Sequence, residues 1–162
     1  MNQLHLVKYQ ENDFEAYFSL VSNEKVMEMI TERAIPLEEA QLNFRKLLER
    51  NRKYEHFGSY KIYDITTNEY IGFGHLTLNE DTDEEAEIGY MILPKYWGMR
   101  FGSAIAKTLV EKAKHLKLKR IKAIIDPNNV PSRKILINQG FISEEVCKID
   151  GLPGEILSKN LL

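Results

Sequence analysis

The first third of the chain combines a short strand pattern with two helix patterns. Residues 4–7 form a short alternating run, which predicts an edge strand. Polar residues at 11–13 supply caps for a helix whose apolar positions over 14–21 share one face. A second helix is predicted to open at 35–37, where a proline suits the first turn, and to end near Asn51.

From residue 60 the pattern changes from helical spacing to alternation. Segments 60–65 and 70–78 flank a turn at 66–68 and predict a β-hairpin. A further strand is predicted at 86–93, after an acidic turn that begins at residue 80. These strands are expected to form an antiparallel meander.

The second half alternates helix and strand. A glycine-bearing turn at 97–102 leads into a helix, followed by a strand over 121–126 and a closing helix over 131–139. Because a helix separates them, the strands at 86–93 and 121–126 are predicted to form a right-handed parallel pair. The last two strands are expected to pair across 150–154.

The pattern as a whole predicts an α/β fold in one domain over residues 1–162. Its sheet is expected to be mixed and mostly antiparallel, with a central parallel strand pair and flanking helices. A length of 162 residues suits one domain, and 43% hydrophobic with 28% charged residues is an ordinary globular composition.

Charge and composition narrow the function classes. A net charge of −2 offers no general attraction to nucleic acid or to an anionic membrane. Residues 1–11 lack an apolar signal core, and no apolar run approaches the roughly 20 residues that cross a bilayer. The single cysteine, Cys147, excludes an internal disulfide, and the four histidines are too scattered to predict a metal site. We therefore expect a cytoplasmic protein without a metal.

The familiar local motifs for nucleotide binding and hydrolysis are missing from the sequence. It has no P-loop, no Rossmann glycine fingerprint, no zinc-protease helix and no nucleophile elbow. What remains is the strand, glycine turn and helix around 86–116, whose unpaired N–H groups could bind an anion such as a phosphate. The alternative is that this turn is only a connection.

Two longer stretches carry a family resemblance. Residues 87–103 read EIGYMILPKYWGMRFGS, and residues 126–141 read DPNNVPSRKILINQGF, with an Asn-x-x-Ser pattern and a terminal Gly-Phe. The first resembles the acetyl-CoA-binding motif of the GNAT N-acetyltransferase superfamily, and the second resembles the closing motif of its branch of ribosomal-protein N-terminal acetyltransferases. The two stretches lie in the second half of the chain.

The resemblance implies a sheet that splays at a site for acetyl-CoA, which would serve as co-substrate. The pantetheine arm is expected to lie in the opening and to pair with backbone groups of strand 86–93. The diphosphate is expected on the amides of the turn, with the closing helix beside it. The implied cofactor-binding residues are Met91, Ile92, Leu93, Trp97, Gly98, Met99, Arg100, Phe101, Gly102, Ser103, Asn129, Ser132 and Lys134.

The sequence departs from the family pattern at two positions. Arg100 stands where the motif has a glycine, so its side chain could crowd the diphosphate or its guanidinium could clasp a phosphate. Leu136 stands where many relatives carry a tyrosine, which leaves protonation of the leaving thiol unassigned. Tyr90 is the fallback for that role.

The resemblance also implies the catalytic residues. Transfer to an amine needs a proton acceptor, because a protonated amine is no nucleophile. Glu87 is the candidate acceptor and Ser132 the candidate aid to the departing thiolate. The alternatives are an ion pair or an exposed strand residue for Glu87, and helix capping for Ser132 and Asn129. His75 is expected to be a satisfied core or hairpin residue.

The predicted function is acetyl transfer from acetyl-CoA to a primary amine by direct attack in a ternary complex. The amine acceptor is a protein N-terminal α-amine or a small molecule. Neither nucleic acid nor membrane is an expected partner, and a homodimer stays open. The alternative function is a non-catalytic acyl-CoA-binding regulatory module.

Overall fold

The structure is a computed structural model that describes residues 3–79 and 81–162. Residues 1 and 2 of the N-terminal segment and Glu80 of the acidic turn lie outside the described residues. One seven-stranded sheet runs through the chain in the order β1-β2-β3-β4-β5-β7-β6. Its strands are β1 (Leu4–Lys8), β2 (Gly58–Asp64), β3 (Tyr70–Leu78), β4 (Glu85–Ile92), β5 (Arg120–Ile125), β6 (Ile142–Ile149) and β7 (Leu152–Asn160).

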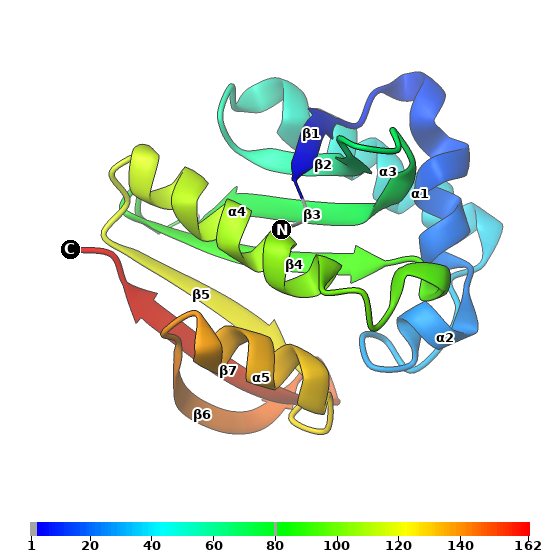
Figure 1. The fold of residues 1–162 in the computed structure, drawn as a ribbon. Coiled ribbons are helices and arrows are strands. Elements are labelled where there is room, and N and C mark those ends of the chain that lie inside the picture. The colour runs from blue at the N-terminus through cyan, green and yellow to red at the C-terminus, as the bar shows by residue number, and fades with distance from the viewer. Residues whose placement is uncertain (1–2, 80) are drawn as a thin grey trace.

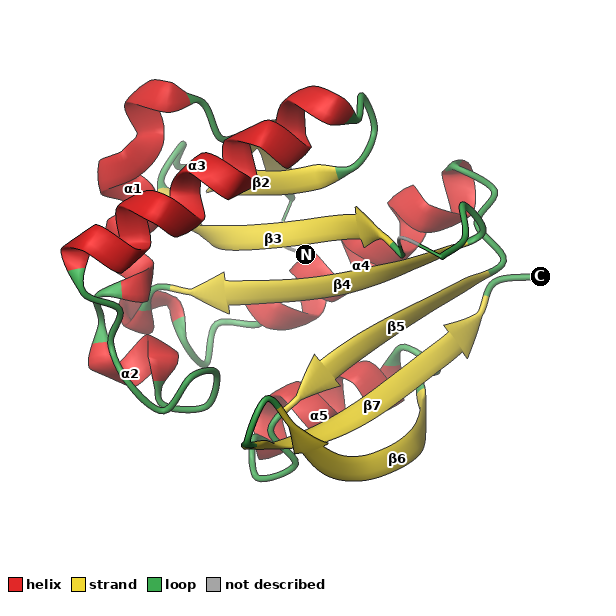
Figure 2. Ribbon diagram, turned by 180° about the vertical axis from the view of Figure 1, so that it is seen from behind, coloured by secondary structure: helices red, strands yellow, loops and turns green. Residues whose placement is uncertain are grey.

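Helices cover both faces of the sheet, as Figures 1 and 2 show from opposite sides. In the described residues, β4 and β5 are parallel and every other neighbouring pair is antiparallel. This confirms the predicted mixed α/β fold, with β1 at one edge. The helical elements are η1 (Glu11–Asp13), α1 (Phe14–Val21), α2 (Glu24–Met27), α3 (Leu37–Lys53), η2 (Pro94–Tyr96), α4 (Phe101–His115) and α5 (Val130–Asn138).

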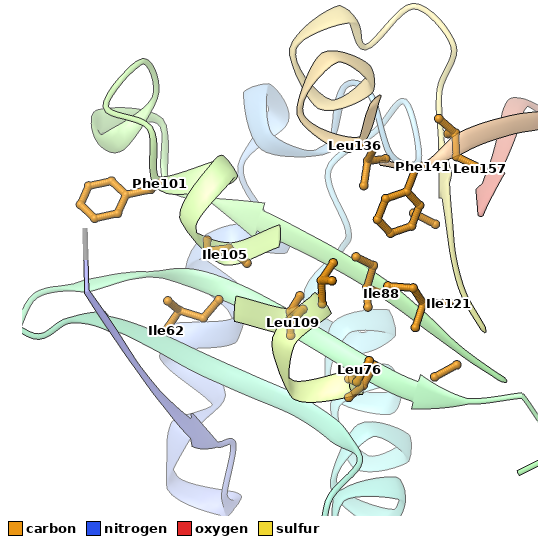
Figure 3. Close-up of a cluster of buried hydrophobic side chains, with 14 of the residues drawn as sticks. Ile62, Leu76, Ile88, Phe101, Ile105, Leu109, Ile121, Leu136, Phe141 and Leu157 are labelled. Carbon is orange, nitrogen blue, oxygen red and sulfur yellow. The ribbon is translucent and has the colours of Figure 1, made fainter. Parts of the chain in front are cut away.

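Strand alternation divides the core between the two faces. On one face, Ile62, Leu76 and Ile88 pack against Ile105 and Leu109 of α4, the cluster drawn in Figure 3. On the other face the aromatic side chains of α1 and α3 pack against Phe73 of β3. Successive residues of β4 therefore point to different helical layers.

The sheet splays between its two parallel strands. The paired positions of β4 and β5 run from Glu85 and Arg120 to Glu87 and Lys122. Beyond them β4 continues to Ile92 and β5 to Ile125, and the two strands diverge in Figures 1 and 2. The splay lies where the family resemblance implies it.

Several helix and strand bounds differ from the predicted ones by one or two residues, and one short helix was not predicted. Helix α3 ends at Lys53, close to its predicted end near Asn51, and the Asn51 side chain bonds the backbone N–H and C=O of Ser59. The closing helix begins one residue earlier than predicted, at Val130, with Asn129 as its N-cap. Helix α2 was not predicted, since four residues carry no readable period.

Candidate active site

The chain turns sharply before it enters α4. Gly98 has φ +75° and Arg100 has φ +68°, the left-handed region that favours glycine. Arg100 is the N-cap residue, no side chain caps the helix, and the first helical bond runs from Ala104 N–H to the Arg100 carbonyl at 3.2 Å. The N–H groups of residues 101–103 therefore have no partner within the helix, and the helix dipole favours an anion there.

Gly102 lets α4 approach two other elements closely. A Cβ added at Gly102 would lie 2.8 Å from Cδ1 of Ile135 on α5 and 3.6 Å from Cδ1 of Ile92 on β4. The start of α4, the end of β4 and the first turns of α5 therefore meet at one junction. This junction adjoins the splay between β4 and β5.

The backbone at the end of β4 faces the splay at Ile92. The Leu93 N–H donates to the Ile71 carbonyl of β3 at 3.0 Å. Because amide directions alternate along a strand, the N–H and C=O of Ile92 face away from β3, toward the side where pairing with β5 has ended. Trp97 Nε1 donates to the Ile92 carbonyl at 2.8 Å. Three residues, Met91, Ile92 and Leu93, are predicted to pair with the pantetheine. Of these, Ile92 is the one whose backbone N–H points into the splay.

The other predicted cofactor residues differ in exposure. Met99 and Ser103 are exposed at the turn, and Lys134 is exposed on α5. Phe101 is only 4% exposed and packs edge-on against Tyr96. The side chain of Phe101 is therefore part of the core, and Phe101 could contact a ligand only through its backbone N–H.

Two hydroxyl groups meet across the junction. The Tyr90 Oη of β4 lies 3.2 Å from the Ser132 Oγ of α5. Asn129 Oδ1 accepts a hydrogen bond from the Ser132 N–H at 3.3 Å, so Asn129 caps α5 as its structural alternative predicts, whereas the Ser132 side chain contacts Tyr90. Burial raises the pKa of Tyr90 above its ordinary value, and the hydrogen bond with Ser132 opposes this effect only in part. Tyr90 is thus a protonated hydroxyl, while Leu136 is 1% exposed and belongs to the core.

Glu87 occupies the opposite face of β4. It forms the last parallel pair with Lys122, so it stands where the two strands part. Burial raises the pKa of Glu87 above the ordinary value for a glutamate, and the positive charge of Lys122 opposes the shift. A carboxylate held in this way is a better proton acceptor than one in water.

His75 lies beside Glu87, and the sequence alone does not predict this contact. Its Nε2 lies 3.9 Å from Glu87 Oε2, and its Nδ1 lies 3.3 Å from Thr77 Oγ1. Burial, helped by the positive charge of Arg50, lowers the pKa of His75 to about 4. His75 is therefore neutral near pH 7. As predicted, it is a hairpin residue whose side chain has a hydrogen-bond partner. Its proximity to Glu87 follows only from the β3–β4 register.

The described residues contain no group of three or more His, Cys, Asp or Glu side chains that could hold a metal ion. Over the same residues, no helix is long and apolar enough to cross a membrane. Cys147 on β6 is a free thiol.

Comparison of the sequence with known families gives one broad match. A family described as "Acetyltransferase (GNAT) domain" matches residues 3–142. YoaA of Bacillus subtilis (strain 168), named an uncharacterized N-acetyltransferase, is 30% identical over 156 residues, which cover 91% of this chain and 84% of YoaA. YnaD of the same strain, named likewise, is 26% identical over 148 residues, covering 90% of this chain and 83% of YnaD.

Solved structures show the same fold. An acetyltransferase of the GNAT family from Bacillus anthracis superposes with a TM-score of 0.80 at 24% identity, covering 99% of both chains. The spermidine N-acetyltransferase from Vibrio cholerae, solved in complex with CoA and spermine, superposes with a TM-score of 0.81 at 17% identity, covering 98% of this chain and 96% of the other.

Proposed function

Because the chain belongs to the GNAT acetyltransferase domain family, we propose that it transfers the acetyl group of acetyl-CoA to a primary amine by direct attack. The observation that carries the proposal is the placement of Glu87 and Tyr90 on opposite faces of β4, beside the splay. A proton acceptor and a proton donor are thereby available on two sides of one opening.

The residues at the junction fit a thioester donor that carries a diphosphate. The N–H groups of residues 101–103 point where a diphosphate would gain from the helix dipole, and the guanidinium of Arg100 supplies a cation beside them. Lys134 and Asn129 would contact the donor from α5, as the family resemblance implies. The Ile92 N–H faces the opening and would bind the thioester carbonyl oxygen. When bound, acetyl-CoA supplies the activated acetyl group.

The chemistry then needs one proton taken and one proton given. An amine with a pKa near 8 or near 10 is mainly an ammonium in water and loses a first proton to solvent before it reacts, and Glu87 accepts the second proton, which the nitrogen releases as it attacks. The neutral nitrogen attacks the thioester carbon, the Ile92 N–H stabilises the oxyanion, and the C–S bond breaks as the C–N bond forms. The leaving thiolate takes the proton of the Tyr90 hydroxyl, which Ser132 orients.

The acceptor is an amine of one of two kinds. The resemblance to ribosomal-protein N-terminal acetyltransferases favours a protein α-amine, whereas a small amine satisfies the same chemistry. We keep the cytoplasm as the proposed location, where a free thiol such as Cys147 stays reduced. A homodimer stays a proposal.

Calorimetric titration with acetyl-CoA and CoA, followed by a thiol-release assay over an amine panel, tests the function. The panel contains a peptide with a free α-amine, the same peptide N-acetylated as a control, a polyamine and an amino sugar. We expect binding in the micromolar range and release with at least one free amine. Binding without release on any amine would favour the non-catalytic acyl-CoA-binding module, and lack of CoA binding would overturn the assignment of the site.

A further inference from the structure

The imidazole of His75 lies across β4 next to Glu87, in a space that a glycine leaves open. In the β3–β4 register His75 is opposite Gly89, and Thr77 is opposite Glu87. A Cβ added at Gly89 would lie 2.4 Å from His75 Nε2. Gly89 has no positive φ, so its backbone conformation does not require a glycine. The absence of a side chain at Gly89 instead makes room for the imidazole of His75.

The neighbours of His75 select one arrangement of its ring proton. Glu87 is a carboxylate and can only accept a hydrogen bond, so Nε2 carries the proton and faces it. The Thr77 hydroxyl then donates to Nδ1. The charged groups that act on this pair from the surrounding elements are Arg50 of α3 and Lys122 of β5.

We propose that His75 is a positioning residue for Glu87: its Nε2–H holds Oε2 of the carboxylate, so that Oε1 is presented to the amine. The proposal rests on the proposed function, in which Glu87 accepts the proton of the amine. The present 3.9 Å separation is longer than a hydrogen bond, and such contacts in ligand-free enzymes tighten when the substrate excludes water.

A neutral donor suits this task better than a cation would. A lysine or arginine at the position of His75 would lower the pKa of Glu87 strongly and weaken it as a proton acceptor. A neutral imidazole fixes the orientation of the carboxylate but stabilises its negative charge less than a lysine or arginine would. Glu87 therefore keeps the basicity that burial gives it.

The test compares His75→Leu with His75→Gln. Leucine fills the space without a donor, whereas the glutamine amide can place an N–H near the position of Nε2. We expect the ¹³C NMR titration of the Glu87 carboxyl to move up by about one pKa unit in His75→Leu and to return in His75→Gln. The acid limb of kcat/KM should move in parallel, and kcat should fall by about tenfold in His75→Leu with KM for the amine little changed.

A second variant reaches the same contact from the other strand. Gly89→Ala keeps the imidazole but displaces it, and its Glu87 titration should resemble that of His75→Leu. CoA affinity and thermal melting verify that each variant is folded. An unchanged Glu87 titration in His75→Leu and Gly89→Ala, or a His75→Gln variant as perturbed as His75→Leu, would overturn the proposal. The NMR titration needs no turnover, so it tests the contact between His75 and Glu87 independently of catalysis. Failure of every amine substrate would count against the proposed function alone.

Discussion

The hydroxyl of Tyr90 lies 3.2 Å from the hydroxyl of Ser132, and this contact joins the end of β4 to the first turn of α5. The closing helix has Leu136 where the family resemblance implies a tyrosine, and that side chain is buried in the core. A proton donor is nevertheless available at the junction, because Tyr90 brings its hydroxyl from the strand.

Tyr90→Phe should abolish this proton donor and keep the packing of the ring. Because general acids contribute about 10²–10⁴-fold, we expect kcat to fall by about 100-fold with little change in acetyl-CoA affinity. Ser132→Ala should have a smaller effect, since it removes only the partner of the donor. Steady-state thiol release and CoA titration measure the two quantities.

Tyr60→Phe is the matched control. Tyr60 is buried and, like Tyr90, has its hydroxyl in a hydrogen bond, which it donates to the His56 carbonyl at 3.1 Å, but it lies on β2 away from the junction. Its kcat should stay within about twofold of the parent. Equal losses in the two variants would show that Tyr90 serves only packing.

Arg100→Gly should stabilise the protein and weaken its hold on acetyl-CoA. Arg100 has φ +68°, which costs a non-glycine residue about 1 kcal/mol, so the melting temperature should rise by about 2–4 °C. Loss of the guanidinium should weaken acetyl-CoA binding by about tenfold.

Acetyl-pantetheine separates the two effects of Arg100, because it lacks the diphosphate. Its affinity should be the same in the parent and in Arg100→Gly if the guanidinium acts on phosphate. Tighter binding of acetyl-CoA by Arg100→Gly would mean instead that the arginine side chain crowds the diphosphate, which is the other alternative that the sequence leaves open.

The order of elements and the parallel strand pair are predictable from the sequence. The change from helical spacing to alternation near residue 60 and the helix between β4 and β5 suffice for that. Helix α2 is not predictable in the same way, because its four residues form a single turn that depends on the Asn23 cap. Local signals therefore predict the longer helices and the strands and miss a helix of a single turn.

The site is only partly predictable, for a different reason. Gly98 and Gly102 mark the turn before α4 in the sequence, but the contact between Tyr90 and Ser132 joins residues 42 positions apart. The approach of His75 to Glu87 depends on the β3–β4 register, which puts His75 opposite Gly89. Side-chain partners across a sheet are determined by strand register and by the alternation of side chains. Sequence motifs alone therefore do not predict them.

Glu87→Gln should lower kcat and remove the acid limb of the pH profile. In the parent, activity rises as Glu87 loses its proton, and burial places that step above the ordinary pKa of a glutamate. The variant has no carboxylate to titrate, so its residual rate, about 100-fold lower, should be flat across that limb. CoA titration should be unchanged. A variant with parental kcat would show that another group accepts the proton.

Arg133→Met should destabilise the attachment of α5 to β7. Arg133 Nε donates to both carboxylate oxygens of Glu155, at 3.0 and 3.2 Å, and Glu155 is only 1% exposed. Removing Arg133 takes the cation from a buried carboxylate that keeps only its hydrogen bond with Ser143, and because Arg133 itself is half exposed we expect urea unfolding to report a loss of about 2 kcal/mol. Arg33→Met is the control, because its pair with Glu39 is exposed and should contribute less than about 1 kcal/mol. Similar losses in the two variants would contradict this account.

Acid should destabilise the protein through His75. Burial lowers the pKa of His75 from 6.5 to about 4, so between these values the unfolded chain binds a proton that the folded chain does not. Its contribution to stability is present above pH 6.5 and is lost as the pH falls toward 4. From pH 7.5 to pH 5 this loss amounts to about 2 kcal/mol.

The raised pKa of Glu87 acts with the opposite sign, because the folded protein takes up that proton first as the pH falls. The measurement is therefore made in the Glu87→Gln background, with and without His75→Gln. Urea unfolding at a series of pH values should show a steeper loss of stability toward acid in the protein that keeps His75. Parallel curves would mean that His75 takes up a proton in the folded protein as readily as in the unfolded chain, and the imidazole would then not be the neutral donor that the contact with Glu87 requires.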